Sequence, residues 1–571
     1  MVASINRKAR GHNCIFKLDM MKAFDRVSWG FLRRLLQKFG FDYRFILLIL
    51  NNLSQSWFFV LVNGRSRGFF QASRGIKQGD PLSPILFILA SEALSRGLNA
   101  LVEGGSVAPY AMPRGCTSIT HLAFADDIVI FARGDRRSVG NLLRFLTLYQ
   151  NGAGQRINKQ KSFFIASKRC GAGQIRQIQH LTGFRHGSFP FSYLGCNLYA
   201  GHRKKEYFHF LIEKFVAKLA GWQKKLLTQG GRLILIKHVL SAIPLHVLAV
   251  MDPPKAVIHS LERLMARFFW GQSEFGPKHH WCSWKNLCYP TAEDGLGLRC
   301  FEDIQGAFSC KLWWRYCNSK SLWADFMRSR YSVHSGAQQA ASRVWRRMLA
   351  VRDTVDQFTQ VIKLDDTVRR AWVLTASGEF TVSLAWDAMR PQQADLGSRR
   401  CIWDCWLPCK ISIFMWKLLN NYLPFPEALR RFGFQLPSKC QFCPTRESQD
   451  HVLSDCSLAT EVWNFFSRVL RIPIQPSNGV VCRLQQWWLY KSQSTARGEL
   501  CRVLASIISW GLWKARNVAM YEGVRLTPTQ VCRNIQALLL SISQSHPFVQ
   551  MAHNDRELVQ SGLLLSMTQK R

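Results

Sequence analysis

The sequence predicts an α+β fold, in which a mixed sheet domain near the amino terminus is followed by largely helical regions. Three observations lead to this prediction. Within residues 1–200, short apolar runs typical of strands are mixed with amphipathic stretches typical of helices. From about residue 201 onward, apolar residues recur mainly at helical spacing. Apolar residues make up 47% and charged residues 20% of the 571 residues, a composition that supports buried cores rather than disorder.

The first 200 residues carry the clearest signals for individual elements. Residues 14–20 form an apolar run that predicts a short strand, and Ser28 is of a residue type that caps the helix expected after it. Residues 82–98 predict a helix with a mostly buried surface. Residues 120–134 place two apolar, β-prone runs around an acidic centre, which predicts a hairpin.

The net charge is the most unusual property of the composition. The chain has 76 Lys and Arg against 36 Asp and Glu, which gives +40 at pH 7. So large a positive charge favours a polyanionic partner, of which nucleic acid is the most common, and an anionic membrane surface is the alternative.

Targeting and membrane signals are weak. No run of 18 purely apolar residues occurs, and the nearest candidate for a membrane span, Leu233–Val250, contains Lys237, His238 and Pro244, so no membrane span and no membrane partner are expected. The amino terminus does not read as a signal peptide, which predicts a nuclear or cytoplasmic location. Most of the 18 cysteines are then expected to be free thiols.

Three carboxylates form the first candidate site. Asp19 ends the predicted strand, and Asp126 and Asp127 are adjacent at the centre of the predicted hairpin. Carboxylate oxygens suit Mg²⁺, and two such ions can hold the attacking and leaving oxygens of an in-line phosphoryl transfer. The alternative is that Asp residues in tight turns serve only local hydrogen bonding.

A cysteine cluster forms the second candidate site. Residues 440–456 contain Cys440, Cys443, His451 and Cys456 at the spacing C-x₂-C-x₇-H-x₄-C. Three thiolates and one imidazole predict a closed, structural zinc site. Cys401, Cys405 and Cys409 lie nearby and could compete as ligands. The basic and aromatic residues around the cluster would suit RNA by charge and stacking, or could be a solvated face; they are Trp416, Lys417, Arg430, Arg431 and Arg446.

Five motifs in sequence order give the chain a resemblance to a known family. They are FKLDMMKAFDRV (16–27), GIKQGDPLSPILF (75–87), FADDIVIF (124–131), GQRINKQKSFFIAS (154–167) and FSYLG (191–195). Together they resemble the motifs of reverse transcriptases, and most closely those of plant LINE-type non-LTR retrotransposons. Residues 403–424, the cysteine cluster and ATEVW (459–463) resemble the zinc-binding region that follows the polymerase in those elements.

The resemblance implies a role for each motif residue. The catalytic, metal-binding carboxylates would be Asp19, Asp126 and Asp127, holding two Mg²⁺ or Mn²⁺ ions. Phe24 would exclude the ribose 2′-hydroxyl, Gln78 and Gly79 would approach template and nucleotide, and Lys161 would lie near the phosphates. The primer grip would comprise Tyr193, Leu194 and Gly195. From the residues alone, Phe24 could instead be core, Gln78 and Lys161 solvated surface, and Tyr193 a half-buried strand aromatic.

The same resemblance implies a right-hand polymerase architecture. Because only 18 residues precede Asp19, the fingers region is expected to be truncated. The expected regions are a palm over 1–200, a basic, thumb-like helical region over 201–300, a connecting region over 301–395, a zinc-binding domain over 396–475 and a helical carboxyl-terminal region over 476–571.

The implied activity is RNA-directed DNA synthesis, with an RNA template, a DNA primer and deoxynucleoside triphosphates as partners and an oligomeric state that stays open. The alternative is a catalytically inactive, nucleic-acid-binding remnant of such an element, which keeps the basic surface and the zinc site. A third reading is a protein similar to group II intron maturases, which share the palm motifs; the cysteine cluster argues against it.

Overall fold

The computed structural model describes the chain as two compact units, each built from several segments. The first unit comprises Met1–His209, Val250–Pro254 and Ser309–Thr381, and the second comprises Phe210–Ala249, Lys255–Phe308 and Val382–Arg571. The residues described are 1–220, 227–273, 276–331, 342–364, 367–395, 397–404, 406–473, 478–490 and 496–544.

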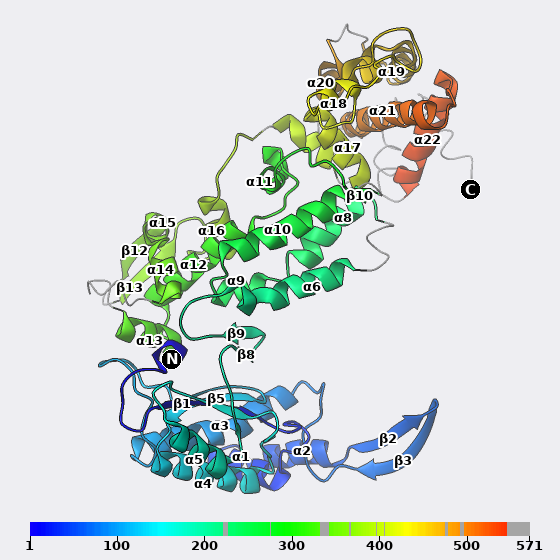
Figure 1. The fold of residues 1–571 in the computed structure, drawn as a ribbon. Helices are drawn as coiled ribbons and strands as arrows, with labels where there is room; N and C mark the ends of the chain where they lie inside the picture. Colours follow the sequence, from blue (N-terminus) through cyan, green and yellow to red (C-terminus); the bar gives the residue numbers. More distant parts are fainter. Residues whose placement is uncertain are drawn as a thin grey trace. The chain divides into compact units, whose positions relative to one another are not determined.

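A five-stranded mixed sheet organises the first unit (Figure 1). Strands β1 and β6 are antiparallel, β1 and β5 are antiparallel, and β4 pairs with β5 as the predicted hairpin. The short strand β7 runs parallel to β6. The order across the sheet is β4 (His121–Phe124), β5 (Asp127–Arg133), β1 (Asn13–Asp19), β6 (Phe163–Ala166) and β7 (Arg185–His186).

One face of this sheet is covered by helices. Because side chains alternate along a strand, Phe16, Leu18, Ile128 and Ile130 share this face and are buried. They pack with residues of α1 (Trp29–Lys38), α3 (Ser83–Glu103), α4 (Arg136–Ala153) and α5 (Ala172–Thr182).

The opposite face carries a smaller apolar cluster and then the acidic residues. Ile15, Val129 and Phe131 pack there with Phe191, which belongs to the hairpin of β8 (Phe191–Tyr193) and β9 (Cys196–Leu198). Asp19 and Asp127 follow the same alternation, so they lie on this face where β1 ends and β5 begins.

Two further parts complete the first unit. After α2 (Tyr43–Ser54), strands β2 (Trp57–Val62) and β3 (Arg65–Gln71) form a separate hairpin whose residues are all exposed. Arg330 donates a hydrogen bond to the Ser4 hydroxyl at 3.2 Å, which ties the later segment to the amino terminus. That segment holds α13 (Leu322–Arg330), α14 (Arg343–Leu349), α15 (Arg352–Gln357), β12 (Thr359–Leu364) and β13 (Thr367–Trp372).

The second unit is largely helical in its described residues. Its long helix α21 (Ala496–Tyr521) packs against α17, α20 and α22. The other elements are α6 (His209–Leu219), α8 (Gln229–Leu235), η3 (Ile236–Leu240), α9 (Leu245–Val250), α10 (Lys255–Trp270), β10 (Gln272–Ser273), β11 (Gly276–Pro277), α11 (Trp284–Leu287), α16 (Val382–Met389), α17 (Cys409–Leu419), α18 (Pro426–Arg430), η7 (His451–Asp455), α19 (Ser457–Val469), α20 (Val480–Leu489) and α22 (Pro528–Gln544). Helix α12 (Phe301–Asn318) begins in this unit and ends in the first.

Helix α3 passes a length-and-composition test for membrane spans, although no span was expected from the sequence. It is long and apolar enough to cross a membrane by length and composition, with a mean hydropathy of 1.5, whereas Leu233–Val250 was expected to be the nearest candidate. One such helix is weak evidence, because core helices pass the same test. Leu86, Ala90 and Leu94 of α3 are buried against the sheet, but only 28% of the apolar window of α3 is buried. The expectation of a mostly buried surface for the helix of residues 82–98 is therefore wrong, because Ile85 and Ile88 on its other side are exposed.

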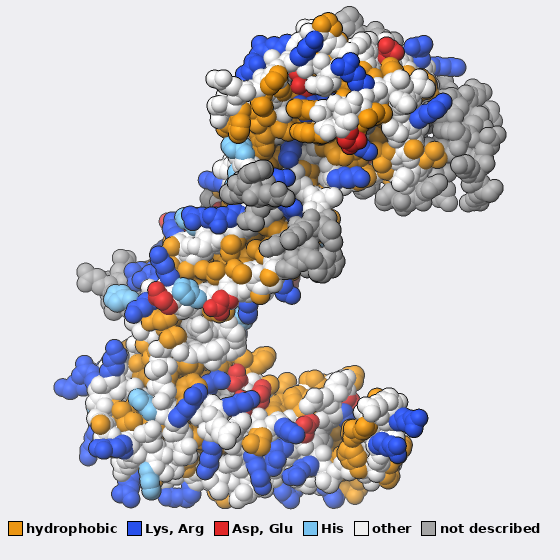
Figure 2. Space-filling view, turned by 45° about the vertical axis from the view of Figure 1, so that its right-hand side comes forward, with side chains coloured by type: hydrophobic (Ala, Val, Ile, Leu, Met, Phe, Trp, Pro, Cys, Tyr) orange, Lys and Arg blue, Asp and Glu red, His pale blue; other side chains and the backbone are white. Residues whose placement is uncertain are grey.

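The positive charge is spread over the surface. Figure 2 shows Lys and Arg side chains across the visible face, interleaved with apolar side chains and with few Asp or Glu. Not all cations of the 203–237 stretch are free for an external partner, however. Arg232 lies 5.9 Å from the Phe268 ring centroid, and burial lowers the pKa of both Arg232 and Lys237.

Candidate active site and candidate metal centre

Asp19 and Asp127 are direct partners in the β1–β5 ladder. Residues directly opposite in an antiparallel pair present their side chains on the same face, so these two carboxylates are neighbours. Asp126 occupies the two-residue connection between β4 and β5, after Ala125 at φ 51°. The backbone carbonyl of Asp126 accepts a hydrogen bond from the Met20 amide at 3.1 Å, which fixes the hairpin turn against the end of β1.

Lys17 is a residue of this site that the sequence analysis did not single out. Its Nζ lies 3.0 Å from Asp127 Oδ1, and the two side chains are 16% and 27% exposed. The signal was present, because Lys17 stands two positions before Asp19 in the strand and therefore on the same face. Tyr193 also lies near this group. Burial is the main cause that raises the pKa of Tyr193, and the negative charge of nearby Asp127 raises it further.

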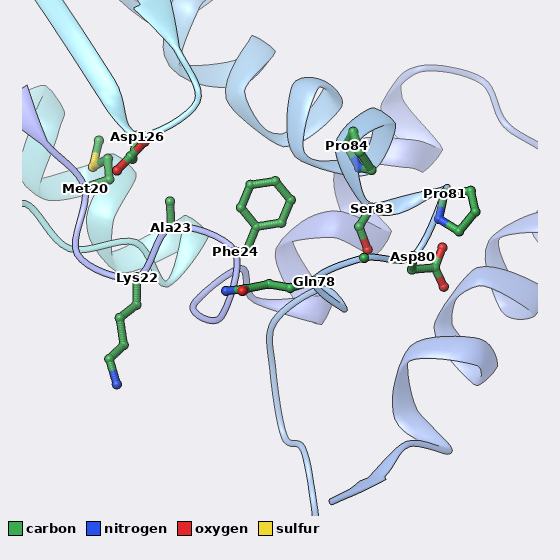
Figure 3. Close-up of a pocket in the computed structure, with 11 residues that line it drawn as sticks. Met20, Lys22, Ala23, Phe24, Gln78, Asp80, Pro81, Ser83, Pro84 and Asp126 are labelled. Atoms are coloured by element: carbon green, nitrogen blue, oxygen red, sulfur yellow. The ribbon is translucent and has the colours of Figure 1, made fainter. Parts of the chain in front are cut away.

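Asp126 faces a cleft of about 650 Å³ (Figure 3). Phe24 stands in the middle of this cleft with Gln78 beside it, while Asp126 lies at one end and Asp80 at the other. The lining residues are Met20, Lys22, Ala23, Phe24, Gln78, Gly79, Asp80, Pro81, Ser83, Pro84 and Asp126. The cleft therefore combines the predicted residues Phe24, Gln78, Gly79 and Asp126.

The position of Phe24 is compatible with both roles considered for it, a core residue and a residue that contacts the sugar of the nucleotide. Its ring is stacked on that of Phe87 of α3, with centroids 4.7 Å apart and planes 7° apart, so one side of the ring packs against the core. The ring remains only partly buried and lines the cleft.

The loop that carries Gln78 and Gly79 is fastened to the chain around Phe24. The amide of Ile76 donates to the carbonyl of Phe24 at 2.9 Å, and the side-chain amide of Gln78 donates to Asp25 Oδ1 at 3.1 Å. Gly75 permits this approach, because it has φ +92° and a Cβ there would lie 2.7 Å from the Asp25 carbonyl oxygen.

The segment that contains Lys161 is anchored to the backbone of Asp19. The Asn158 amide donates to the Asp19 carbonyl at 2.8 Å, and the Asp19 amide donates to Ser162 Oγ at 3.1 Å. Lys161 itself is exposed, and its amide donates to Asn158 Oδ1 at 3.3 Å. Asp19 is held in place, but it is not among the residues that line the cleft.

The predicted primer-grip residues form a tight hairpin turn. Tyr193 and Cys196 are paired across β8 and β9, and the two residues between them, Leu194 and Gly195, have φ of 48° and 75°. Two successive positive φ values match the type I′ turn that suits a two-residue hairpin, which explains the glycine at the second position.

The four predicted zinc ligands are gathered at one point. Cys440 Sγ lies 3.8 Å from Cys456 Sγ, Cys443 Sγ lies 3.0 Å from His451 Nε2, and all four ligand atoms lie within 4.8 Å of one another. A tetrahedron with zinc–sulfur bonds of about 2.3 Å has edges of roughly 3.8 Å, so this donor set fits Zn²⁺. Among the residues that the structure describes, this is the one group of His, Cys, Asp and Glu gathered this closely.

The three predicted catalytic carboxylates are arranged differently from the cysteine cluster. Asp19 and Asp127 share a sheet face with Lys17, whereas Asp126 is exposed and lines the cleft. The backbone thus brings the three residues to one hairpin end, while the side chain of Asp127 is engaged by a cation of the protein.

The segment from Cys440 to Cys456, here called the zinc loop, is tied to the surrounding helices through the residues between its ligands. Glu447 accepts a hydrogen bond from Arg516 of α21 at 2.6 Å, and Asp450 accepts one from the Val480 amide at the start of α20 at 2.8 Å. The Gln449 side chain donates to the carbonyl of Leu418, which lies near the end of α17, at 3.0 Å. The loop is therefore part of a helical assembly rather than a module with a core of its own.

Two of the predicted RNA-binding residues near the cluster are engaged within the protein. Trp416 is fully buried and donates to the Asp294 carbonyl, so its ring is not open for stacking. Lys417 is half-buried and its ammonium donates to Gln229 Oε1 at 2.6 Å, and burial lowers its pKa to about 8. Arg430, Arg431 and Arg446 are exposed. Of the competing cysteines, Cys405 lies outside the described residues, and Cys401 and Cys409 are not part of the cluster.

Both candidate sites lie in regions that match known protein families. Residues 2–198 match the family described as reverse transcriptase (RNA-dependent DNA polymerase). The chain carries a reverse transcriptase domain. Residues 380–463 match the family described as zinc-binding in reverse transcriptase, so the zinc-binding region named by the sequence resemblance is confirmed.

Relatives of the reverse transcriptase domain occur in retrotransposable elements. The chain is 32% identical over 160 residues to the Pol polyprotein of the type-1 retrotransposable element R2 of Popillia japonica (28% of this chain, 25% of the relative). It is 30% identical over 266 residues to that of the type-2 element R2DM of Drosophila melanogaster (44% and 23%). An Arabidopsis thaliana protein that carries the provisional name of a ribonuclease H protein is 24% identical over 403 residues (55% and 64%). The chain spans less than two thirds of the length of these relatives.

Proposed function

We propose that this protein is the RNA-directed DNA polymerase part of a LINE-type non-LTR retrotransposon, with an RNA template, a DNA primer and deoxynucleoside triphosphates as substrates. The observation that carries the proposal is the β4–β5 hairpin: Asp126 lines a cleft with Phe24 and Gln78, while Asp127 is paired with Asp19. Divalent ions, as two Mg²⁺ or Mn²⁺, would be held by Asp19, Asp126 and Asp127 and would neutralise charge during in-line nucleotidyl transfer.

The residues of the chain would position the substrates. The ring of Phe24, fixed by its stack on Phe87, would meet the sugar of the incoming nucleotide and reject a 2′-hydroxyl. Gln78 and Gly79 would contact the nucleotide and template from beside Phe24 in the cleft. The exposed Lys161 would attract the triphosphate, and the hairpin turn of Tyr193, Leu194 and Gly195 would hold the primer end.

The proposed architecture is that of a right-hand polymerase. The five-stranded sheet with its helices would be the palm, and the helices of residues 201–300 would be the thumb, whose outward cations would follow the duplex backbone. We place the protein in the nucleus or cytoplasm, where such templates occur.

Primer extension on an RNA template tests the proposal. The zinc-loaded full chain should incorporate deoxynucleotides in the presence of Mg²⁺, and Asp126→Ala should abolish incorporation. Glu103→Ala, which removes an exposed carboxylate elsewhere on α3, should leave it unchanged. If the folded, zinc-loaded protein shows no incorporation above background, the proposal fails in favour of an inactive nucleic-acid-binding remnant.

A further inference from the structure

The second unit carries an exposed surface on which aromatic and basic side chains alternate. It is built from two segments far apart in the sequence, one before α11 and one that runs from the last residue of α18 toward the zinc loop. We call it the aromatic–basic patch and define it as Lys278, His279, Trp281, Arg430, Phe432 and Phe434.

Three rings join the two segments. The His279 and Phe432 ring centroids lie 4.0 Å apart, and those of Trp281 and Phe432 lie 5.7 Å apart with nearly perpendicular planes. His279 and Trp281 also meet edge to face at 5.6 Å. Phe432 and Phe434 are nevertheless 45% and 54% exposed, so apolar aromatic surface remains open beside this joint.

The patch has a rigid base. Trp281 contacts Tyr422 with centroids 6.4 Å apart, and Tyr422 in turn contacts the buried Trp416 at 5.4 Å. The Trp416 indole donates to the Asp294 carbonyl at 2.9 Å. The exposed rings are thus the outer end of an aromatic series that begins in the core.

The charge around the patch is mainly positive, although Glu427 of α18 is exposed three positions before Arg430. Residues 428–446 contain Arg430, Arg431, Lys439 and Arg446 and no Asp or Glu. Arg430, Phe434 and Leu436 line a hollow of about 540 Å³ in this segment. On the other segment, burial is the main cause that lowers the pKa of His280, and the positive charges of His279 and Arg267 add to it.

We infer that the aromatic–basic patch binds single-stranded nucleic acid, with Phe432 and Phe434 stacking on unpaired bases and Lys278 and Arg430 contacting phosphates. Every base offers a flat face for stacking, so such a surface binds single strands with little sequence preference. A duplex conceals its bases and would use only the cations, and an acidic peptide would leave the exposed rings without a partner. The inference goes beyond the proposed polymerase activity, because it concerns a surface of the second unit and needs no nucleotide incorporation.

Fluorescence anisotropy with the zinc-loaded full chain tests the inference. The probes are a labelled oligouridylate, the matching oligodeoxythymidylate, a duplex of the same length and a labelled polyglutamate, so that RNA, DNA, duplex and acidic peptide are compared directly. The test variants are Phe432→Ala, Phe434→Ala and Arg430→Gln. The matched control is Phe465→Ala with Arg468→Gln, an exposed aromatic and an exposed cation of α19 in the same unit. Circular dichroism and zinc content verify the fold.

Each phenylalanine variant should weaken single-strand binding at least about five-fold, as the loss of one stacked base predicts. Arg430→Gln should reduce the slope of log affinity against log salt by roughly 0.7 for one lost phosphate contact. The control should bind as the parent does. Equal binding by Phe432→Ala, Phe434→Ala and the control would overturn the inference. So would patch variants that lose polyglutamate but keep both oligonucleotides, because the surface would then serve an acidic protein.

Discussion

The guanidinium of Arg516 donates from Nε to Glu447 Oε1 at 2.6 Å, and the two side chains are only 2% and 3% exposed. Glu447 lies in the zinc loop and Arg516 on α21, so this pair connects the two. The Phe425 and Trp513 rings lie 5.5 and 5.3 Å from the guanidinium. A site of three thiolates, one imidazole and Zn²⁺ carries a net negative charge, so Arg516 offsets the further negative charge that Glu447 brings beside it.

Arg516→Met should therefore destabilise the second unit strongly, because it leaves the Glu447 carboxylate buried without a partner. The expected loss is about 3–5 kcal/mol in urea unfolding of the zinc-loaded protein. The double variant Glu447→Gln, Arg516→Met should lose less than the sum of the two single variants. Arg400→Met, which breaks an exposed pair with Asp395 in the same unit, should change stability by at most about 1 kcal/mol. A small effect of Arg516→Met would show that the zinc loop is held without this pair.

Zinc removal should unfold more than the ligand loop. Residues between the ligands bond to α17, α20 and α21, so these helices should lose order when the loop is released. We expect one zinc per chain by metal analysis, a loss of helical circular dichroism on chelation, and new proteolytic cleavage within residues 406–544. Cys443→Ser should reproduce this, whereas Cys482→Ser, at a half-buried cysteine outside the cluster, should not. An unchanged spectrum after complete chelation would contradict the expectation.

Local sequence signals predicted much of the first unit's fold. The strand expected over 14–20 corresponds to β1, the helix expected over 82–98 corresponds to α3, and the hairpin of 120–134 is β4 and β5. Each of these depends on periodicity or turn chemistry within a few residues of its own position. The same local signals placed the four cysteine-cluster residues together, because their spacing is short.

Interactions between residues far apart in the chain could not be predicted from the sequence. Arg516 lies 69 residues from Glu447, and nothing in either local pattern predicts a buried ion pair. Lys417 was expected at a basic surface, but its position beneath Trp270 depends on packing between α10 and α17. The β2–β3 hairpin was not predicted either: its run of apolar residues reads as core, yet the side chains are exposed.

Phe24→Ala should relax the selection of deoxynucleotides. If the ring excludes the 2′-hydroxyl, its removal should raise ribonucleotide incorporation relative to deoxynucleotide incorporation by at least about ten-fold. Since Phe24 is only partly buried, loss of its stack on Phe87 should cost less than the roughly 3–5 kcal/mol of a fully buried Phe. Single-nucleotide insertion assays with each sugar give the ratio. Phe24→Tyr, which keeps a ring, should stay selective, and an unchanged ratio in Phe24→Ala would assign Phe24 to the core alone.

Lys417 should make the stability of the second unit depend on alkaline pH. Burial is the main cause that lowers its pKa from 10.5 to about 8, and the positive charge of Lys278 adds to it. The unfolded chain therefore binds more protons than the folded chain between about pH 8 and 10.5, so this group's contribution to the free energy of unfolding rises with pH across that window. Below pH 8 its full penalty is present, at about 3 kcal/mol from a shift of this size. Lys417→Met should accordingly stabilise the protein near pH 7 by roughly 1–3 kcal/mol. The gain is less than the full penalty because the variant also loses the hydrogen bond from Lys417 to Gln229.

Urea unfolding near pH 7 and near pH 10 measures this effect, and the difference between parent and variant cancels the other titrating groups. The advantage of Lys417→Met should shrink at the higher pH, where the parent lysine is largely neutral in the folded state. Lys410→Met, at an exposed lysine of the same helix, should give equal differences at both pH values. A stability advantage of Lys417→Met that is the same at both pH values would mean that the lysine is not charged and buried in the folded protein at neutral pH.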